Sequence, residues 1–281
     1  MTTIEILADA LTAYRSGDRA KAAARAGEAA GSTLGAELAT YLSGAGSAPV
    51  YDQPSAFTAF IRGGGNVELY RRLSAELAAR YDATSPESLL DLGCGDGLAV
   101  VPALAQAAHT PSRIDLVEPS AALLDTVRER VPEAQCWQAT AEEFLARDDL
   151  GWDFAQSTFA LQSIPPEVRA DVLRTLQLRT GRLVLAEFDV PEFTEGSPEH
   201  LRSLVARYER GIAEYGEDAP LVAQGFLLPI LLGIVSGDQR TNWEHPAATW
   251  ADDLRTAGFT DVTIEPLADY WWSPAVLITA C

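Results

Sequence analysis

The feature that most constrains this chain is a short apolar segment followed by alternating glycines, at residues 88–97 (SLLDLGCGDG). Residues 88–92 have the length and composition of a buried strand, and residues 98–106 have the pattern of a helix. The turn between them holds three glycines, Gly93, Gly95 and Gly97. Glycine adopts positive φ at little cost and lets a ligand approach the backbone, and the following helix start offers free N–H groups. The segment therefore predicts a cradle for a nucleotide.

An acidic residue follows the next predicted strand at an informative distance. Residues 113–117 (RIDLV) form a second apolar strand, and Glu118 stands at its carboxyl end, 21 residues beyond Gly97. In doubly wound sheets, an acid about 20 residues past the glycine turn accepts hydrogen bonds from ribose hydroxyls. The glycines do not follow the dinucleotide spacing GxGxxG, which disfavours a nicotinamide oxidoreductase. We expect another nucleoside-type cofactor.

Strands and helices are predicted to alternate beyond the glycine turn, as a parallel sheet covered on both faces requires. The further strands are expected at residues 134–138, 152–158, 182–188, 260–267 and 271–280, and the helices at 120–130, 141–146, 165–178 and 247–257. Right-handed crossovers place the carboxyl ends of the parallel strands at one edge, where a cofactor binds.

Four segments resemble motifs of class I S-adenosylmethionine-dependent methyltransferases. The pattern DxGxGxG at residues 91–97 resembles motif I, and TAEEF at 140–144 resembles the acidic motif that contacts adenine. QSTFALQSI at 156–164 resembles the motif after the fourth strand, and AGFTDVTIEPL at 257–267 resembles the closing strands. The resemblance covers about residues 85–190 and 245–280.

The resemblance implies an α/β fold with a Rossmann-like seven-stranded sheet, mostly parallel with an antiparallel last strand, accompanied by N-terminal helices and an inserted helical cap. Residues 1–82 would then form an N-terminal helical segment that covers the active site. Residues 83–190 and 241–281 would form the S-adenosylmethionine-binding core, and residues 191–240 the inserted helical cap for substrate.

The same resemblance implies S-adenosylmethionine as the cofactor and S-adenosylhomocysteine (SAH) as the product. The backbone of Ser157 and Thr158 would line the methionine portion, and Asp91 would support the glycine turn. The acid that relatives carry at the position of Thr140 is missing. The predicted cofactor-binding residues are Tyr51, Arg62, Asn66, Asp91, Gly93, Gly95, Glu118, Pro119, Thr140, Ala141, Glu142, Ser157 and Thr158.

The predicted substrate pocket lies beside the predicted sulfonium position. Phe159 could stack near that cation, and Gln162 stands where many relatives carry a histidine, which removes one usual base. The predicted pocket residues are Phe159, Gln162, Trp243 and Glu187. The predicted catalytic residues are His245, as general base where the inserted helices rejoin the core, and Tyr51; Glu187 and Asp189 are alternatives.

Charge and cysteine content limit the partners. The net charge is -19, and no basic cluster is longer than Arg71 and Arg72. We therefore expect neither nucleic acids nor anionic membrane surfaces as partners, since both require cationic side chains. The three cysteines show no pairing or metal-ligand spacing, so we expect no metal site and a reduced, cytoplasmic setting. The first ten residues lack the features of a signal peptide.

The regions outside the resemblance are predicted to be helical. Residues 3–46 should form two or three short helices, with Ser16, Asp18 and Ser32 as N-caps, which pack on the main domain or join a homodimer. Residues 198–215 should form an amphipathic helix. Residues 219–235 should form an almost wholly apolar helix that does not anchor in a membrane and either fills a cap or walls an apolar substrate pocket.

The sequence leaves several functions open. The favoured one is transfer of a methyl group to an O, N or activated C of a small, partly apolar metabolite in secondary metabolism. The alternative is an S-adenosylmethionine-binding catalyst on the same fold, similar to a cyclase or pericyclase, that does not transfer the methyl group. Both keep motif I and Glu118, so the sequence does not separate them. A nicotinamide oxidoreductase and a regulatory binding module are more remote.

Overall fold

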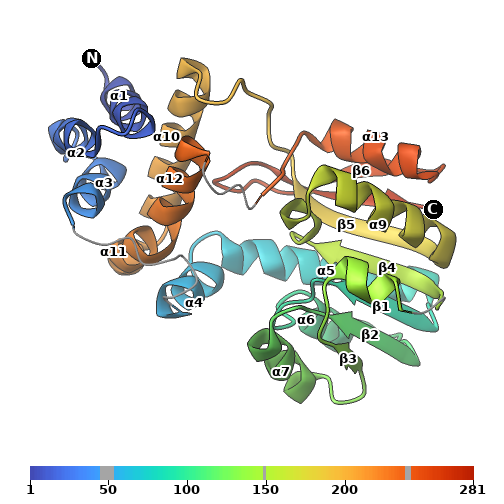
Figure 1. Cartoon of the computed structure of the whole chain (residues 1–281). Helices are drawn as coiled ribbons and strands as arrows, with labels where there is room; N and C mark the ends of the chain where they lie inside the picture. Colours follow the sequence, from blue (N-terminus) through green and yellow to red (C-terminus); the bar gives the residue numbers. More distant parts are fainter. Residues whose placement is uncertain (45–53, 148–149, 238–241) are drawn as a thin grey trace. The chain divides into compact units, whose positions relative to one another are not determined.

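The computed structural model describes residues 1–44, 54–147, 150–237 and 242–281 (Figure 1). The chain divides into two compact units. The helical unit comprises Met1–Val67, Glu192–Arg240 and Tyr270–Ser273. The sheet unit comprises Glu68–Pro191, Thr241–Asp269 and Pro274–Cys281. Each unit is thus assembled from segments that are far apart in the sequence.

The sheet unit contains a seven-stranded sheet in the order β3-β2-β1-β4-β5-β7-β6. Its strands are β1 (Ser88–Leu92), β2 (Arg113–Val117), β3 (Gln135–Trp137), β4 (Trp152–Thr158), β5 (Thr180–Phe188), β6 (Thr263–Ala268) and β7 (Ala275–Ala280). The pairs among β1 to β5 are parallel, whereas β7 is inserted antiparallel between β5 and β6. The predicted mostly parallel sheet with an antiparallel last strand is confirmed.

The central strands are apolar because helices cover both of their faces. Four of the five residues of β1 are buried, and β5 is buried without interruption from Leu183 to Glu187. The helices of this unit are α5 (Asn66–Thr84, whose first two residues belong to the helical unit), α6 (Val100–Gln106), α7 (Ala121–Arg130), α8 (Ala141–Leu145), α9 (Pro166–Arg179) and α13 (Ala247–Ala257). Helices α9 and α13 lie on one face of the sheet, and α5 and α6 on the other (Figure 1).

The helical unit holds seven α-helices within its described residues. They are α1 (Thr3–Arg15), α2 (Arg19–Glu28), α3 (Thr33–Ser43), α4 (Pro54–Arg62), α10 (Pro198–Ala213), α11 (Ala219–Val222) and α12 (Leu228–Ser236). Asp18 and Ser32 cap α2 and α3 as predicted, through side-chain hydrogen bonds to Lys21 N and Gly35 N. The prediction for Ser16 was wrong, because this residue ends α1 and its hydroxyl donates to Ala13 O.

The predicted apolar helix is interrupted by a π-helical turn. Residues Ala223–Leu227 form this turn between α11 and α12. The helical stretch Gly216–Ser236 is long and apolar enough to cross a membrane by length and composition, and 56% of its most apolar window is buried inside the protein. Leu227, Leu228 and Leu231 are each at most 1% exposed. Such burial is what a core helix shows.

The predicted strand at 271–280 was wrong over its first four residues. Strand β7 begins at Ala275, and Trp271 packs instead in the helical unit, where it is 5% exposed. Its ring lies 5.5 Å from that of Tyr208, and a Cβ on Gly211 would lie 2.5 Å from it. The large apolar side chain therefore packs on a helix of this unit rather than continuing the strand.

Candidate functional site

The glycine turn after β1 has the geometry that its sequence predicts. Gly93, Gly95 and Gly97 have φ values of 75°, 57° and 80°, which other residues rarely adopt. A Cβ on Gly93 would lie 2.4 Å from that of Ala160, so the turn packs directly on the segment after β4. At Gly95 the corresponding space is open, with nothing within 4 Å. A ligand can therefore approach the backbone at Gly95.

Glu118 is held beside this open backbone. It is 8% exposed, and its two carboxylate oxygens accept hydrogen bonds from Gly95 N at 3.1 Å and from Ser120 N at 2.9 Å. Burial raises the pKa of this carboxyl, and the two amide donors oppose the rise. Its remaining lone pairs can accept hydrogen bonds from vicinal hydroxyls such as those of a ribose. Pro119 follows on the exposed surface.

A buried hydrogen-bond chain lies behind the turn. The Tyr81 hydroxyl donates to Gln156 Oε1 at 2.6 Å, and Gln156 Nε2 donates to Asp91 Oδ2 at 2.9 Å. Asp91 is 1% exposed, and its Oδ1 has no hydrogen-bond partner among the described residues. Burial, aided by the nearby Glu118 charge, raises the pKa of Asp91 to about 7, although the bond from Gln156 opposes the rise. Asp91 is thus anchored by Gln156, and its Oδ1 is unsatisfied within the described residues.

The predicted adenine-contacting residues begin α8. Thr140 forms a capping box, in which its hydroxyl accepts from Glu143 N and its own N–H donates to Glu143 Oε2. The Thr140 side chain is therefore engaged within the protein. Ala141 is the first helical residue, and Glu142 is exposed.

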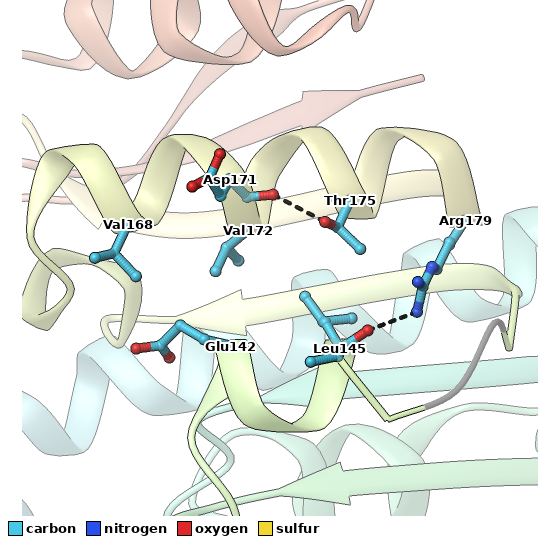
Figure 2. A pocket seen from close by; sticks show the side chains of 8 residues that line it. Glu142, Leu145, Val168, Asp171, Val172, Thr175 and Arg179 are labelled. Atoms are coloured by element: carbon cyan, nitrogen blue, oxygen red, sulfur yellow. Dashed lines mark hydrogen bonds between the residues drawn. The ribbon is translucent and has the colours of Figure 1, made fainter.

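A groove of about 350 Å³ runs between α8 and α9. Figure 2 shows Glu142 and Val168 at one end and Arg179 at the other, where it donates to Leu145 O. Neither the glycine turn nor Glu118 lines it. Glu142 lines it, so the groove adjoins the predicted adenine contact and not the glycine turn.

The segment after β4 contains a strained aromatic residue. Phe159 has a φ of 54°, its N–H donates to Ala186 O at 2.8 Å, and its ring stacks on Phe188 at 4.5 Å. Positive φ in a bulky residue is rare outside functional or tightly constrained positions. The Ser157 hydroxyl donates to Leu92 O, so this side chain joins β4 to β1 and leaves the backbone of Ser157 for a ligand.

Three of the predicted substrate residues lie together with Phe159. Gln162 Nε2 donates to Phe159 O at 3.2 Å, and Trp243 N donates to Gln162 O at 2.7 Å. The carboxyl group of Glu187, which is fully buried, faces the backbone amides of Leu161 and Gln162. The structure therefore brings together Phe159, Gln162, Trp243 and Glu187.

His245 is held by a buried arginine. Arg169, 1% exposed, donates to His245 Nε2, to Trp243 O at 3.0 Å and to Leu161 O at 3.4 Å, and its guanidinium lies 4.2 Å from the centre of a Trp250 ring. A guanidinium only donates, so His245 Nε2 carries no proton and is already engaged as an acceptor. This geometry favours a positioning role for His245 over that of general base.

The predicted cofactor residues nearer the N-terminus belong to the helical unit. Asn66 is buried and donates to Phe60 O and Tyr215 Oη, and its Oδ1 accepts from the Tyr270 hydroxyl at 3.0 Å. Arg62 ends α4 and is exposed. Tyr51 lies outside the described residues.

The sequence reasoning missed Tyr81, Gln156 and Arg169. Gln156 carried a signal, since it is a polar residue inside a strand that is otherwise buried. Arg169 carried one as well, because it shares the helical spacing of the buried residues Val172, Leu173 and Leu176. No group of three or more His, Cys, Asp or Glu side chains in the described ranges could hold a metal ion.

Comparison with known proteins agrees with this arrangement. Residues 89–179 match the family model of a methyltransferase domain. No curated protein sequence matches the chain significantly.

Two solved structures illustrate the similarity of fold. Mitomycin 7-O-methyltransferase has a TM-score of 0.53 and 17% identity, and the match covers 82% of this chain and 59% of that one. Magnesium protoporphyrin IX methyltransferase from Synechocystis, with bound SAH, has a TM-score of 0.51 and 15% identity, with 82% of this chain and 95% of that one covered. This chain thus spans 59% of the length of the mitomycin enzyme.

Residues 89–179 thus match a methyltransferase domain family, and the chain has the Rossmann-like fold of the two solved structures. S-adenosylmethionine is the cofactor of this family. The open backbone at Gly95 beside Glu118 fits the nucleoside part of that cofactor.

Proposed function

We propose that this chain is an S-adenosylmethionine-dependent methyltransferase that modifies an O, N or activated C of a small, partly apolar metabolite in secondary metabolism. The observation that carries the proposal is the pairing of Glu118 with Gly95, which places an oriented carboxylate beside an open stretch of backbone. The match of residues 89–179 to a methyltransferase domain supports it.

The proposed cofactor contacts divide by position along the sheet edge. Glu118 and Pro119 hold the ribose, the start of α8 at Ala141 and Glu142 contacts adenine, and the backbone of Ser157 and Thr158 lines the methionine portion. Asp91 and Gly93 fix the shape of the turn. We also retain the sequence-based proposals that Tyr51, Arg62 and Asn66 bind the cofactor and that residues 191–240 select the substrate.

The chemistry that bound S-adenosylmethionine supplies is a methyl group on a sulfonium, which a nucleophile takes by in-line displacement. Catalysis of this step depends mostly on alignment of the two reacting centres at about 3–3.5 Å. In this chain Phe159 supplies an aromatic ring for the cationic end, and its stacking on Phe188 fixes that ring. A proton acceptor is needed only when the nucleophile loses a proton, and Glu187 is the proposed alternative to His245.

Calorimetry with SAH and with NADH tests the cofactor assignment. We expect SAH to bind and NADH not to bind. Glu118→Ala should lower the SAH affinity about 10- to 100-fold, because hydrogen bonds to a charged group are worth about 1.5–3 kcal/mol. Glu133→Ala removes an exposed acid of the same charge and serves as the control. Tight NADH binding without SAH binding would overturn the proposal.

Transfer of a labelled methyl group tests the reaction. Incubation of the protein with methyl-labelled S-adenosylmethionine and a panel of small acceptors should give a labelled product. A product that forms only with S-adenosylmethionine but carries no label would instead identify the alternative, a catalyst that binds this cofactor without transferring its methyl group.

A further inference from the structure

Three buried acceptor atoms at the ends of β4 and β5 have no donor. They are Oε1 of Gln162 and both carboxyl oxygens of Glu187, which have no hydrogen bond of regular geometry to a described residue, although the amides of Leu161 and Gln162 lie near Glu187. Gln162 Nε2 donates to Phe159 O, so the orientation of this amide is set and its Oε1 remains as the acceptor. Buried polar atoms are nearly always paired in folded proteins, and this cluster therefore calls for a donor that the described residues do not supply.

The charges around Glu187 are unbalanced. Burial raises the pKa of Glu187 well above its ordinary value, and the neighbouring Glu244 raises it further. Arg169 and the amides of Gln162 and Leu161 oppose the rise. The Arg169 guanidinium is shared, because it donates to three other acceptors and lies 3.7 Å from Asp253 Oδ2. Glu187 therefore has no positive partner of its own among the described residues.

We propose that the methyl acceptor carries a protonated amine, which donates to Gln162 Oε1 and to the carboxylate of Glu187. A primary ammonium has three donors and no acceptor, which matches three acceptors without donors. A hydroxyl brings one donor and no charge. The stacked rings of Phe159 and Phe188, which lie beside these residues in the chain, favour an aromatic or apolar body next to the amine. This inference rests on the proposed methyltransferase function and specifies its substrate class.

Matched pairs of small ligands test the proposal. Calorimetry on the SAH-saturated protein at pH 7.5 would compare 2-phenylethylamine with 2-phenylethanol, and benzylamine with benzyl alcohol. We expect each amine to bind at least tenfold more tightly than its alcohol. Glu187→Gln should abolish this preference and leave SAH affinity unchanged, which shows that the variant is folded. Glu129→Gln, which removes an exposed acid of the same charge, should retain the preference.

Proton release provides a second readout that a purely structural role would not produce. Burial raises the pKa of Glu187, and pairing with an ammonium group should lower it again, so amine binding should release protons from this carboxyl. The heat of amine binding should therefore differ between phosphate and Tris buffer, because the two buffers take up a released proton with different enthalpies. For the wild type the difference should correspond to up to one released proton, and Glu187→Gln should show no such difference.

Two outcomes separate the failures. The amine proposal would be overturned if the amines bind no better than the alcohols, or if their preference survives Glu187→Gln. The proposed methyltransferase function would still stand in that case, provided that SAH binds. Absence of SAH binding by the wild type would overturn the function itself.

Discussion

Asp91 should make the stability of this protein fall as the pH rises. Its pKa is raised from 3.8 to about 7, so the folded state holds the proton more tightly than the unfolded state. The stabilisation is complete below pH 3.8 and is lost as the pH rises to about 7. At about 1.4 kcal/mol for each pH unit, the whole change is about 4 kcal/mol, of which about 2 kcal/mol falls between pH 5.5 and 7.

Asp91→Asn removes this titration. The free energy of unfolding of the variant relative to the wild type should therefore shift in favour of the variant by about 2 kcal/mol between pH 5.5 and 8. The measurement is urea unfolding followed by circular dichroism at each pH, which starts above the isoelectric point near 4.4 to keep the protein soluble. Because the other buried acids titrate in both proteins, their contributions cancel in the difference between the two free energies of unfolding.

An exposed acid provides the control. The Asp125 side chain is 69% exposed and pairs with Arg128 on the surface of α7, so Asp125→Asn should shift by less than about 0.5 kcal/mol over the same range. A flat difference for Asp91→Asn would show that Asp91 ionises at its ordinary pKa. It would refute the argument that burial without a partner for Oδ1 controls this group.

Three further substitutions test the packing. Gly93→Ala places a Cβ 2.4 Å from the Cβ of Ala160 at a residue with positive φ. It should lower the free energy of unfolding by about 1–3 kcal/mol or more and weaken SAH binding in calorimetry. Gly27→Ala, in open space on α2, is the control and should be neutral or stabilising. Arg169→Met leaves buried acceptors without their donor and should cost about 3–5 kcal/mol in urea unfolding. Trp271→Ala should cost about 3–5 kcal/mol, measured in the same way, and an unchanged unfolding midpoint for either variant would contradict its assigned packing.

The regular part of the sheet unit was predictable from local patterns. The observed bounds of β1, β2 and β4 are those predicted, as are those of α13. These segments are short apolar runs or an amphipathic repeat between clear turn residues, so the local signal and the tertiary environment agree. The antiparallel direction of the last strand came from family resemblance rather than from residue patterns.

The errors in the fold have a common cause. Trp271 has strand-like chemistry, yet it packs against Tyr208 and Gly211 in the helical unit, 60 residues or more away in sequence. The π-helical turn at Ala223–Leu227 lies within an apolar segment that has no local marker for it. Both features depend on partners that a sequence window does not contain.

The candidate site shows the same division. Gly95 and Glu118 were predictable, because the turn requires glycine and the spacing to the next strand end is fixed by the length of one strand–helix–strand unit. The engagement of His245 by Arg169 was not, since these residues are 76 positions apart and meet only through the packing of α9.

The sequence by itself determined where the strands and the glycine turn lie and which acid stands beside that turn, since these follow from local composition and short, regular spacings. Only the tertiary structure decided which buried polar groups have partners. In the part of the chain that the structure describes, Asp91 Oδ1, Gln162 Oε1 and the Glu187 carboxyl oxygens have no regular hydrogen bond, whereas His245 is engaged. Hydrogen-bond satisfaction depends on atoms brought together from distant segments, and it is this property that points to the ligand.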